Sequence, residues 1–110
     1  MNITTTESGE VKVIALNGNF DTSTSPDAEA HFDALINEGT TKIIVDLKDI
    51  DYISSAGLRV LLVTTKLIKN KGGQCRICNL NEMVQEVFDI SGFSMIFGVF
   101  QSVDDALEGF

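Results

Sequence analysis

The 110-residue sequence has no tryptophan, one proline and a single histidine, His31, and it contains no long uninterrupted run of apolar residues. A transmembrane helix needs about 20 consecutive apolar residues. A membrane span is therefore not expected, and the first residues lack the basic flank and apolar core of a signal peptide. We expect a cytoplasmic protein. The hydrophobic content of 44% is enough for one core, which predicts a single domain over residues 1–110.

Positive charge is also scarce. Sixteen acidic side chains against eight basic ones give a formal net charge of −8. Binding to a phosphate backbone depends on an excess of lysine and arginine. The composition thus argues against nucleic acid as a partner and gives only a weak indication of basic protein partners.

The only two cysteines, Cys75 and Cys78, have the spacing of a redox or metal pair. A structural zinc site needs about four ligands, and the sequence offers no second pair. A redox pair places its first thiol at a helix N-terminus, whereas residues 74–79 are typical of a strand, in which side chains at i and i+3 point to opposite faces. We expect two ordinary buried thiols, no metal site and no cofactor.

Groups for catalysis are few as well. A nucleophilic serine requires a nearby base and a third group that orients the base. His31 has no catalytic motif around it, and the chain contains neither a Gly-x-Ser-x-Gly elbow nor a glycine-rich phosphate loop. We expect that the protein is not an enzyme.

Local patterns predict alternating strands and helices. Apolar and β-branched runs predict strands at residues 2–7, 11–17, 42–47, 74–79 and 97–100, with a Ser8-Gly9 turn closing the first hairpin. Capping residues and apolar spacing predict helices at residues 25–38, 55–69 and about 79–90, and a short helix after Ser102. Residues 18–26 are expected to be a polar loop that ends in the start of the first helix, and residues 48–53 are expected to be a second loop. This order predicts an α/β fold with one mixed, mostly parallel sheet and helices packed mainly on one face.

The sequence also predicts the capping residues of two of these helices and the buried face of one of them. The first is expected to be capped by Ser25. The third has capping-box spacing from Asn79 to Glu82, and its expected buried stripe is Met83, Val84, Val87 and Phe88.

Two serines, Ser54 and Ser55, open the longest predicted helix. A serine hydroxyl there can cap free backbone N–H groups, and an anion there faces the positive end of the helix dipole. Spacing alone favours the cap, with Ser55 as the capping residue. Val60, Val63 and Leu67 widen the apolar arc of this helix, which fits either a neighbouring helix or a partner protein.

Three segments, taken in order, resemble the bacterial anti-sigma factor antagonists of the STAS-domain family. They are Gly18-Asn19-Phe20-Asp21, the run from Ile43 to Leu47 that leads through Tyr52-Ile53 to Ser54-Ser55-Ala56-Gly57-Leu58, and Phe88-Asp89-Ile90-Ser91-Gly92. The resemblance covers nearly the whole chain and implies a STAS-like single domain. It also implies a partner that is both anti-sigma factor and serine kinase, of the histidine-kinase-like ATPase type, and a PP2C-type phosphatase that reverses the modification.

The serine motif suggests specific roles within that resemblance. Ser55 aligns with the family's phosphoacceptor, Ser54 replaces the usual aspartate and is an alternative acceptor, and Ala56 replaces a second hydroxyl residue. The family's loop aspartate aligns with Asp21. The partner-binding residues implied in this way are Asp21, Thr22, Ser54, Ser55, Ala56, Gly57 and Arg59. The alternative function is a stand-alone STAS module in a ligand-sensing or non-sigma complex.

Overall fold

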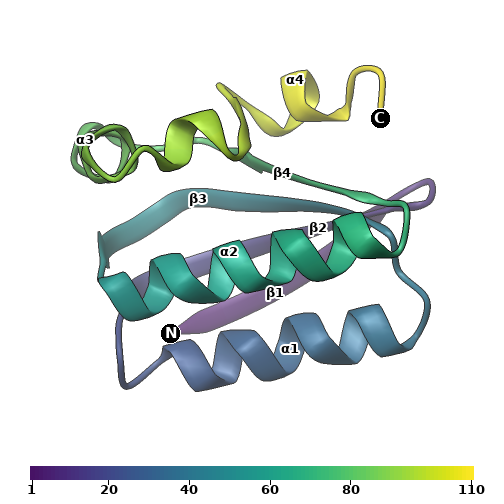
Figure 1. The fold of residues 1–110 in the computed structure, drawn as a ribbon, viewed down its shortest axis with the longest axis horizontal. Helices are drawn as coiled ribbons and strands as arrows, with labels where there is room; N and C mark the ends of the chain where they lie inside the picture. The colour runs from purple at the N-terminus through teal and green to yellow at the C-terminus, as the bar shows by residue number, and fades with distance from the viewer.

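The computed structural model describes all residues 1–110, which form a five-stranded sheet in the order β1-β2-β3-β4-β5 (Figure 1). β1 is antiparallel to β2, and every other neighbouring pair is parallel, which confirms the predicted mixed, mostly parallel sheet. The strands are β1 (Asn2–Ser8), β2 (Val11–Phe20), β3 (Lys42–Ile53), β4 (Gln74–Cys78) and β5 (Gly98–Phe100). The helices are α1 (Ser25–Asn37), α2 (Ser55–Asn70), α3 (Glu82–Ile90), a 3-10 turn (Phe93–Met95) and α4 (Val103–Leu107).

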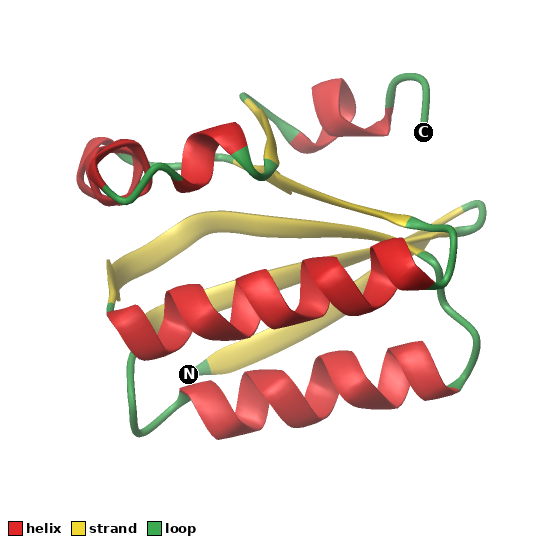
Figure 2. Cartoon of the chain, viewed as in Figure 1, coloured by secondary structure: helices red, strands yellow, loops and turns green.

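Two apolar clusters lie on opposite faces of this sheet. The larger cluster includes Phe20, Phe32, Leu61 and Phe88 and lies beneath α1, α2 and α3. Helices α1 and α2 run side by side across that face (Figure 2). The smaller cluster, centred on Ala106, lies beneath α4. The helices therefore pack mainly on one face, as predicted, and α4 is the exception. None of the helices is both long and apolar enough to cross a lipid bilayer.

Two strands are longer than the sequence pattern predicts. β2 continues through Phe20 and β3 through Ile53, so residues 18–20 and 48–53, which were expected to be loops, belong to the sheet. The extensions pair with each other in parallel, with two register shifts between Ala15 and Asn19. These bulges interrupt the alternation of apolar and polar residues. The alternation that predicts a strand therefore ends before β2 and β3 themselves end.

Smaller corrections concern turns and caps. The hairpin turn lies at Gly9 and Glu10, one residue later than expected, because Ser8 still pairs with Val11. Thr24, not Ser25, is the N-cap residue of α1, and Ser25 is buried in its first turn.

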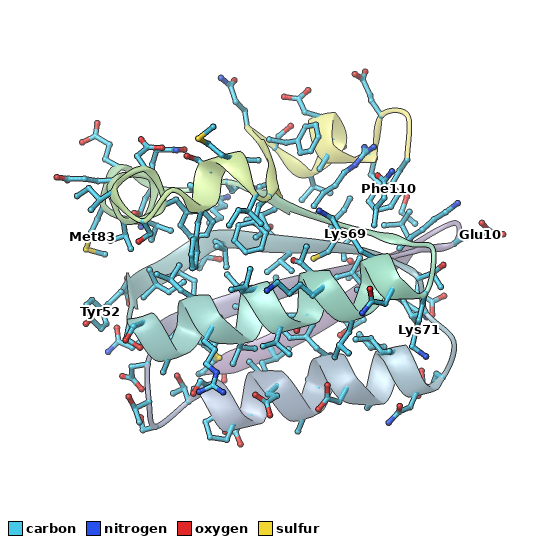
Figure 3. The ribbon with its side chains drawn as sticks, in the orientation of Figure 1. Glu10, Tyr52, Lys69, Lys71, Met83 and Phe110 are labelled. Atoms are coloured by element: carbon cyan, nitrogen blue, oxygen red, sulfur yellow. The ribbon has the colours of Figure 1, made fainter.

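Helix α3 also begins later than its capping-box spacing predicts. Asn81 caps it by accepting a hydrogen bond from the Val84 N–H (2.8 Å), whereas Asn79 is left-handed at φ 60°. Val84 and Phe88 are buried as expected. Met83 is 41% exposed and points away from the core (Figure 3), so its place in the buried stripe was wrong.

The two cysteines lie as the strand pattern predicts. Both thiols are free and buried, and Cys75 belongs to the larger cluster while Cys78 belongs to the smaller one across the sheet. Burial raises the pKa of the Cys75 thiol to about 11. Burial, together with the nearby Asp46 carboxylate, raises the pKa of Cys78 to about 12. Neither thiol is ionised at neutral pH.

Arg76 of β4 holds the C-terminal segment against the sheet. Its Nη1 donates hydrogen bonds to the carbonyl oxygens of Ala106 (2.8 Å) and Glu108 (2.7 Å). Its Nη2 donates to the carbonyl of Gly109 (3.3 Å). The guanidinium also lies over the rings of Phe100 and Phe110, at 5.1 and 4.4 Å from their centroids. A single side chain thus satisfies one carbonyl in the last turn of α4 and two that follow the helix.

Replacing Arg76 with alanine is expected to lower the free energy of unfolding by about 1.5–3 kcal/mol, the range for hydrogen bonds to a charged group. Urea denaturation followed by far-UV circular dichroism measures this change. Lys66→Ala is the matched control, because Lys66 is exposed and its loss should matter by less than about 0.5 kcal/mol. An Arg76→Ala protein as stable as that control would show that the segment does not depend on Arg76.

Candidate functional site

The end of β2 and the start of α2 are joined by close backbone contacts. The N–H of Ser54 donates a hydrogen bond to the carbonyl oxygen of Phe20 (2.9 Å). One turn later, a Cβ built on Gly57 would lie 2.7 Å from that same oxygen and 2.9 Å from Cγ of Phe20. Only glycine allows the helix to approach the strand this closely. The contact fixes the first turn of α2 beside the loop that follows β2.

Ser54 and Ser55 occupy different positions in this first turn. Ser54 is the N-cap residue, with an extended backbone, and its Oγ accepts a hydrogen bond from the Gly57 N–H (3.4 Å). Ser55 is the first helical residue, is exposed, and makes no side-chain hydrogen bond. The cap that spacing alone assigned to Ser55 is therefore supplied by Ser54. The Ser55 hydroxyl is accessible and unpaired.

The loop after β2 is organised by Asp21. Its Oδ1 accepts hydrogen bonds from the N–H (2.9 Å) and Oγ (2.7 Å) of Ser23 and from the N–H of Thr24 (3.2 Å). The hydrogen bond from the Ser23 hydroxyl is the main reason that the pKa of Asp21 is lowered. The carboxylate is therefore negative at neutral pH. Because Asp21 follows Phe20 directly, this charge lies near the start of α2, with Thr22 exposed beside it.

A groove of about 710 Å³ separates the first halves of α1 and α2. Its lining residues are Ser25 and Glu29 from α1 and Ser55, Ala56, Arg59, Val60 and Val63 from α2. Val60 is buried in the core, whereas Val63 and the nearby Leu67 are 39% and 38% exposed. The wide apolar arc of α2 is thus used partly for packing and partly left at the surface.

The two walls of the groove carry opposite charges. Helix α1 contains carboxylates but no lysine or arginine, whereas α2 contains arginine and lysine but no acidic residue. Among the lining residues, Glu29 is the acidic one on α1 and Arg59 is the basic one on α2. Lys69 and Lys71 lie at the far end of α2 (Figure 3). A protein that docks here meets an acidic wall and a basic wall beside a small apolar floor.

His31 lies outside the groove. Its Nε2 is 2.6 Å from Oγ1 of Thr5, in a hydrogen bond that joins α1 to β1. No cluster of three or more histidine, cysteine, aspartate or glutamate side chains is placed to hold a metal ion. Glu29 is the one lining residue that could act as a base.

The structure brings most of the implied partner-binding residues together. Three of them, Ser55, Ala56 and Arg59, line the groove, while Ser54 and Gly57 build the turn that opens it. Asp21 and Thr22 lie beside that turn without lining the groove. Sequence reasoning missed the α1 wall, above all Glu29. No sequence signal was available for it, because only the packing of α1 against α2 brings Glu29 to the groove.

Comparison with known proteins identifies the family of this chain. A family model for the STAS domain matches residues 2–106. BtrV of Bordetella bronchiseptica, which is named as an anti-sigma factor antagonist, is 38% identical over 98 residues, covering 89% of this chain and 84% of its own. An anti-sigma F factor antagonist of Paenibacillus polymyxa is 32% identical over 98 residues, covering 88% and 84%.

Solved structures share the fold at lower identity. An anti-sigma factor antagonist from Thermotoga maritima superposes with a TM-score of 0.92 at 23% identity, covering 96% of this chain and 92% of its own. The anti-sigma factor antagonist SpoIIAA in its unphosphorylated form gives a TM-score of 0.83 at 20% identity, covering 97% and 94%. SpoIIAA from Bacillus has also been solved in its phosphorylated form, with a TM-score of 0.76 at 20% identity and 97% coverage of both chains.

Proposed function

Because this chain belongs to the STAS-domain family of anti-sigma factor antagonists, we propose that phosphorylation of Ser55 controls its binding to an anti-sigma factor. The unphosphorylated protein binds the anti-sigma factor over the start of α2 and thereby keeps it from its sigma factor. The phosphorylated protein releases the anti-sigma factor. The output is a change in which sigma factor is free to act.

The observation that carries this proposal is the division of roles between two adjacent serines. Ser54 caps α2, so the helix does not depend on the Ser55 hydroxyl. Ser55 is exposed at the edge of a groove where a kinase can reach it. In the transfer, its Oγ forms a bond to the γ-phosphorus of ATP while the bond from that phosphorus to ADP breaks. The hydroxyl proton passes to a base of the kinase.

A phosphate at Ser55 affects the domain and the complex in opposite ways. It adds a charge of about −1.5 to −2. At the first turn of α2 that charge gains about 0.3–1 kcal/mol from the helix dipole, so the domain keeps its fold. A partner docked over the same turn meets a new negative charge next to Asp21 and Glu29. Like charges brought together in an interface cost several kcal/mol.

We further propose that the anti-sigma factor is itself the kinase, of the histidine-kinase-like ATPase type, and that a PP2C-type phosphatase restores Ser55 in the cytoplasm. Support comes from the family and from SpoIIAA, a protein of the same fold that exists in both unphosphorylated and phosphorylated forms. The module acts by binding and carries no catalytic residue of its own in this scheme.

Intact mass spectrometry after incubation with ATP and the kinase that co-purifies with the protein tests the proposal. We expect the mass of one phosphate on the wild type and on Ser54→Ala, and none on Ser55→Ala. Ser54→Ala is a matched control because it removes the neighbouring hydroxyl. Phosphate on Ser55→Ala, with none on Ser54→Ala, would move the acceptor to Ser54 and contradict the assignment.

A further inference from the structure

Arg59 is the cation placed nearest to Ser55 along α2. The two residues are four positions apart on one helix, a spacing that puts side chains on the same face with Cβ atoms about 5–6 Å apart. Both line the groove between α1 and α2. The next cation of α2 is Lys66, eleven residues after Ser55, or about 16 Å along the helix axis. No other basic side chain lines the groove.

Arg59 has no ionic partner in the unmodified protein. The only salt bridges in the structure join Lys12 to Glu7 and Lys42 to Glu10, all outside the groove. Glu29, on the opposite wall, is the one acidic residue that lines the groove, and it forms no salt bridge with Arg59. The guanidinium is exposed and is free to turn along the helix. Its hydrogen-bonding capacity is unused.

We infer that Arg59 becomes the intramolecular counter-ion of a phosphate on Ser55, an inference that rests on the function proposed above. An anionic residue four positions before a cationic one is the favourable order on a helix. A guanidinium can donate two parallel hydrogen bonds to phosphate oxygens, which lysine cannot. Glu29 acts in the same direction, because its charge repels the phosphate from the α1 wall and towards Arg59.

The consequence is that phosphorylation changes the partner surface twice. It adds negative charge at the start of α2, and it withdraws the positive charge of Arg59 from the groove. A partner with an acidic group directed at Arg59 loses that attraction at the moment it meets the new repulsion. Arg59 thus contacts the partner in the unphosphorylated protein and positions the phosphate in the phosphorylated protein.

The test uses phosphoserine incorporated at position 55 during synthesis, so that no kinase is needed. Titration followed by ³¹P NMR gives the second dissociation constant of the phosphate. We expect this constant to be about two- to threefold larger in wild type than in Arg59→Gln, because a helical ion pair of this spacing contributes about 0.2–0.5 kcal/mol and a bidentate pair somewhat more. Arg59→Lys should fall in between. Glu29→Gln should increase the constant, since it removes a repelling charge.

Lys66→Gln is the matched control and should leave the titration unchanged, because Lys66 is too far along α2. Equal constants for wild type and Arg59→Gln would overturn the inference. So would a Lys66→Gln effect as large as that of Arg59→Gln, which would indicate a general charge effect. Neither result would touch the proposed function, which fails instead if the kinase does not modify Ser55.

Discussion

Replacing Gly57 with alanine is expected to lower the free energy of unfolding by about 1–2 kcal/mol, although in an open helical position the same change raises it by about 1 kcal/mol. The added methyl group would lie 2.7 Å from the carbonyl oxygen of Phe20 and 3.0 Å from Cγ1 of Ile53. A backbone carbonyl cannot turn aside as a flexible side chain can. To make room, the start of α2 must move, which also stretches the hydrogen bond from the Ser54 N–H to Phe20.

Urea denaturation of Gly57→Ala measures the stability change. Ser55→Ala is the control, because it adds no atom to a packed region and its side chain makes no hydrogen bond; we expect a change within about 0.5 kcal/mol. An alanine at position 57 that left stability equal to wild type, or raised it, would mean that the helix and β2 are not in such close contact. Since this contact positions Ser55, the variant should also bind the anti-sigma factor more weakly at temperatures where it remains folded.

Ser55→Asp is expected to weaken binding to the anti-sigma factor by a factor on the order of a hundred, while the domain stays folded. The substituted carboxylate gains from the helix dipole within the domain, but in a complex it is a negative charge held against a surface that accepts a hydroxyl. An unpaired or repelled charge in an interface costs several kcal/mol, and 1.4 kcal/mol is already a factor of ten. Isothermal titration calorimetry with the purified anti-sigma factor measures the change.

Two variants separate charge from shape in this experiment. Ser55→Asn introduces a side chain of similar size without charge and should bind much more tightly than Ser55→Asp. Ser55→Ala should bind like wild type and should not dissociate when ATP is added, because it cannot be phosphorylated. If Ser55→Asp bound as tightly as wild type, or if Ser55→Asn were equally weak, electrostatic release would be wrong.

The parts of the fold with regular patterns were predictable from sequence. Pro26 and Gly39 frame α1, and its apolar positions Ala28, Phe32, Leu35 and Ile36 are all buried. Alternating residues of β2 belong to the two apolar clusters on opposite faces of the sheet. In such segments, local propensity and tertiary burial favour the same structure.

The parts that could not be predicted depend on long-range pairing. Asp49, Asp51 and Tyr52 are exposed and polar enough to suggest a loop, yet they extend β3 because β2 continues beside them. The same holds for the α1 wall of the groove. Glu29 is one surface acid among many in the sequence, and only the packing of α1 against α2 places it opposite Arg59. The serine motif, by contrast, was found from sequence, although the cap was assigned to the wrong serine.

The placement of the two thiols has a practical consequence. Cys75 and Cys78 are on opposite faces of the sheet, buried and protonated at neutral pH. Oxidants and alkylating reagents should therefore leave both thiols of the native protein unmodified. The rate of thiol modification then reports global unfolding, since both sulfurs become accessible only when the sheet unfolds. The two buried thiols therefore give the chain its own chemical probe of unfolding.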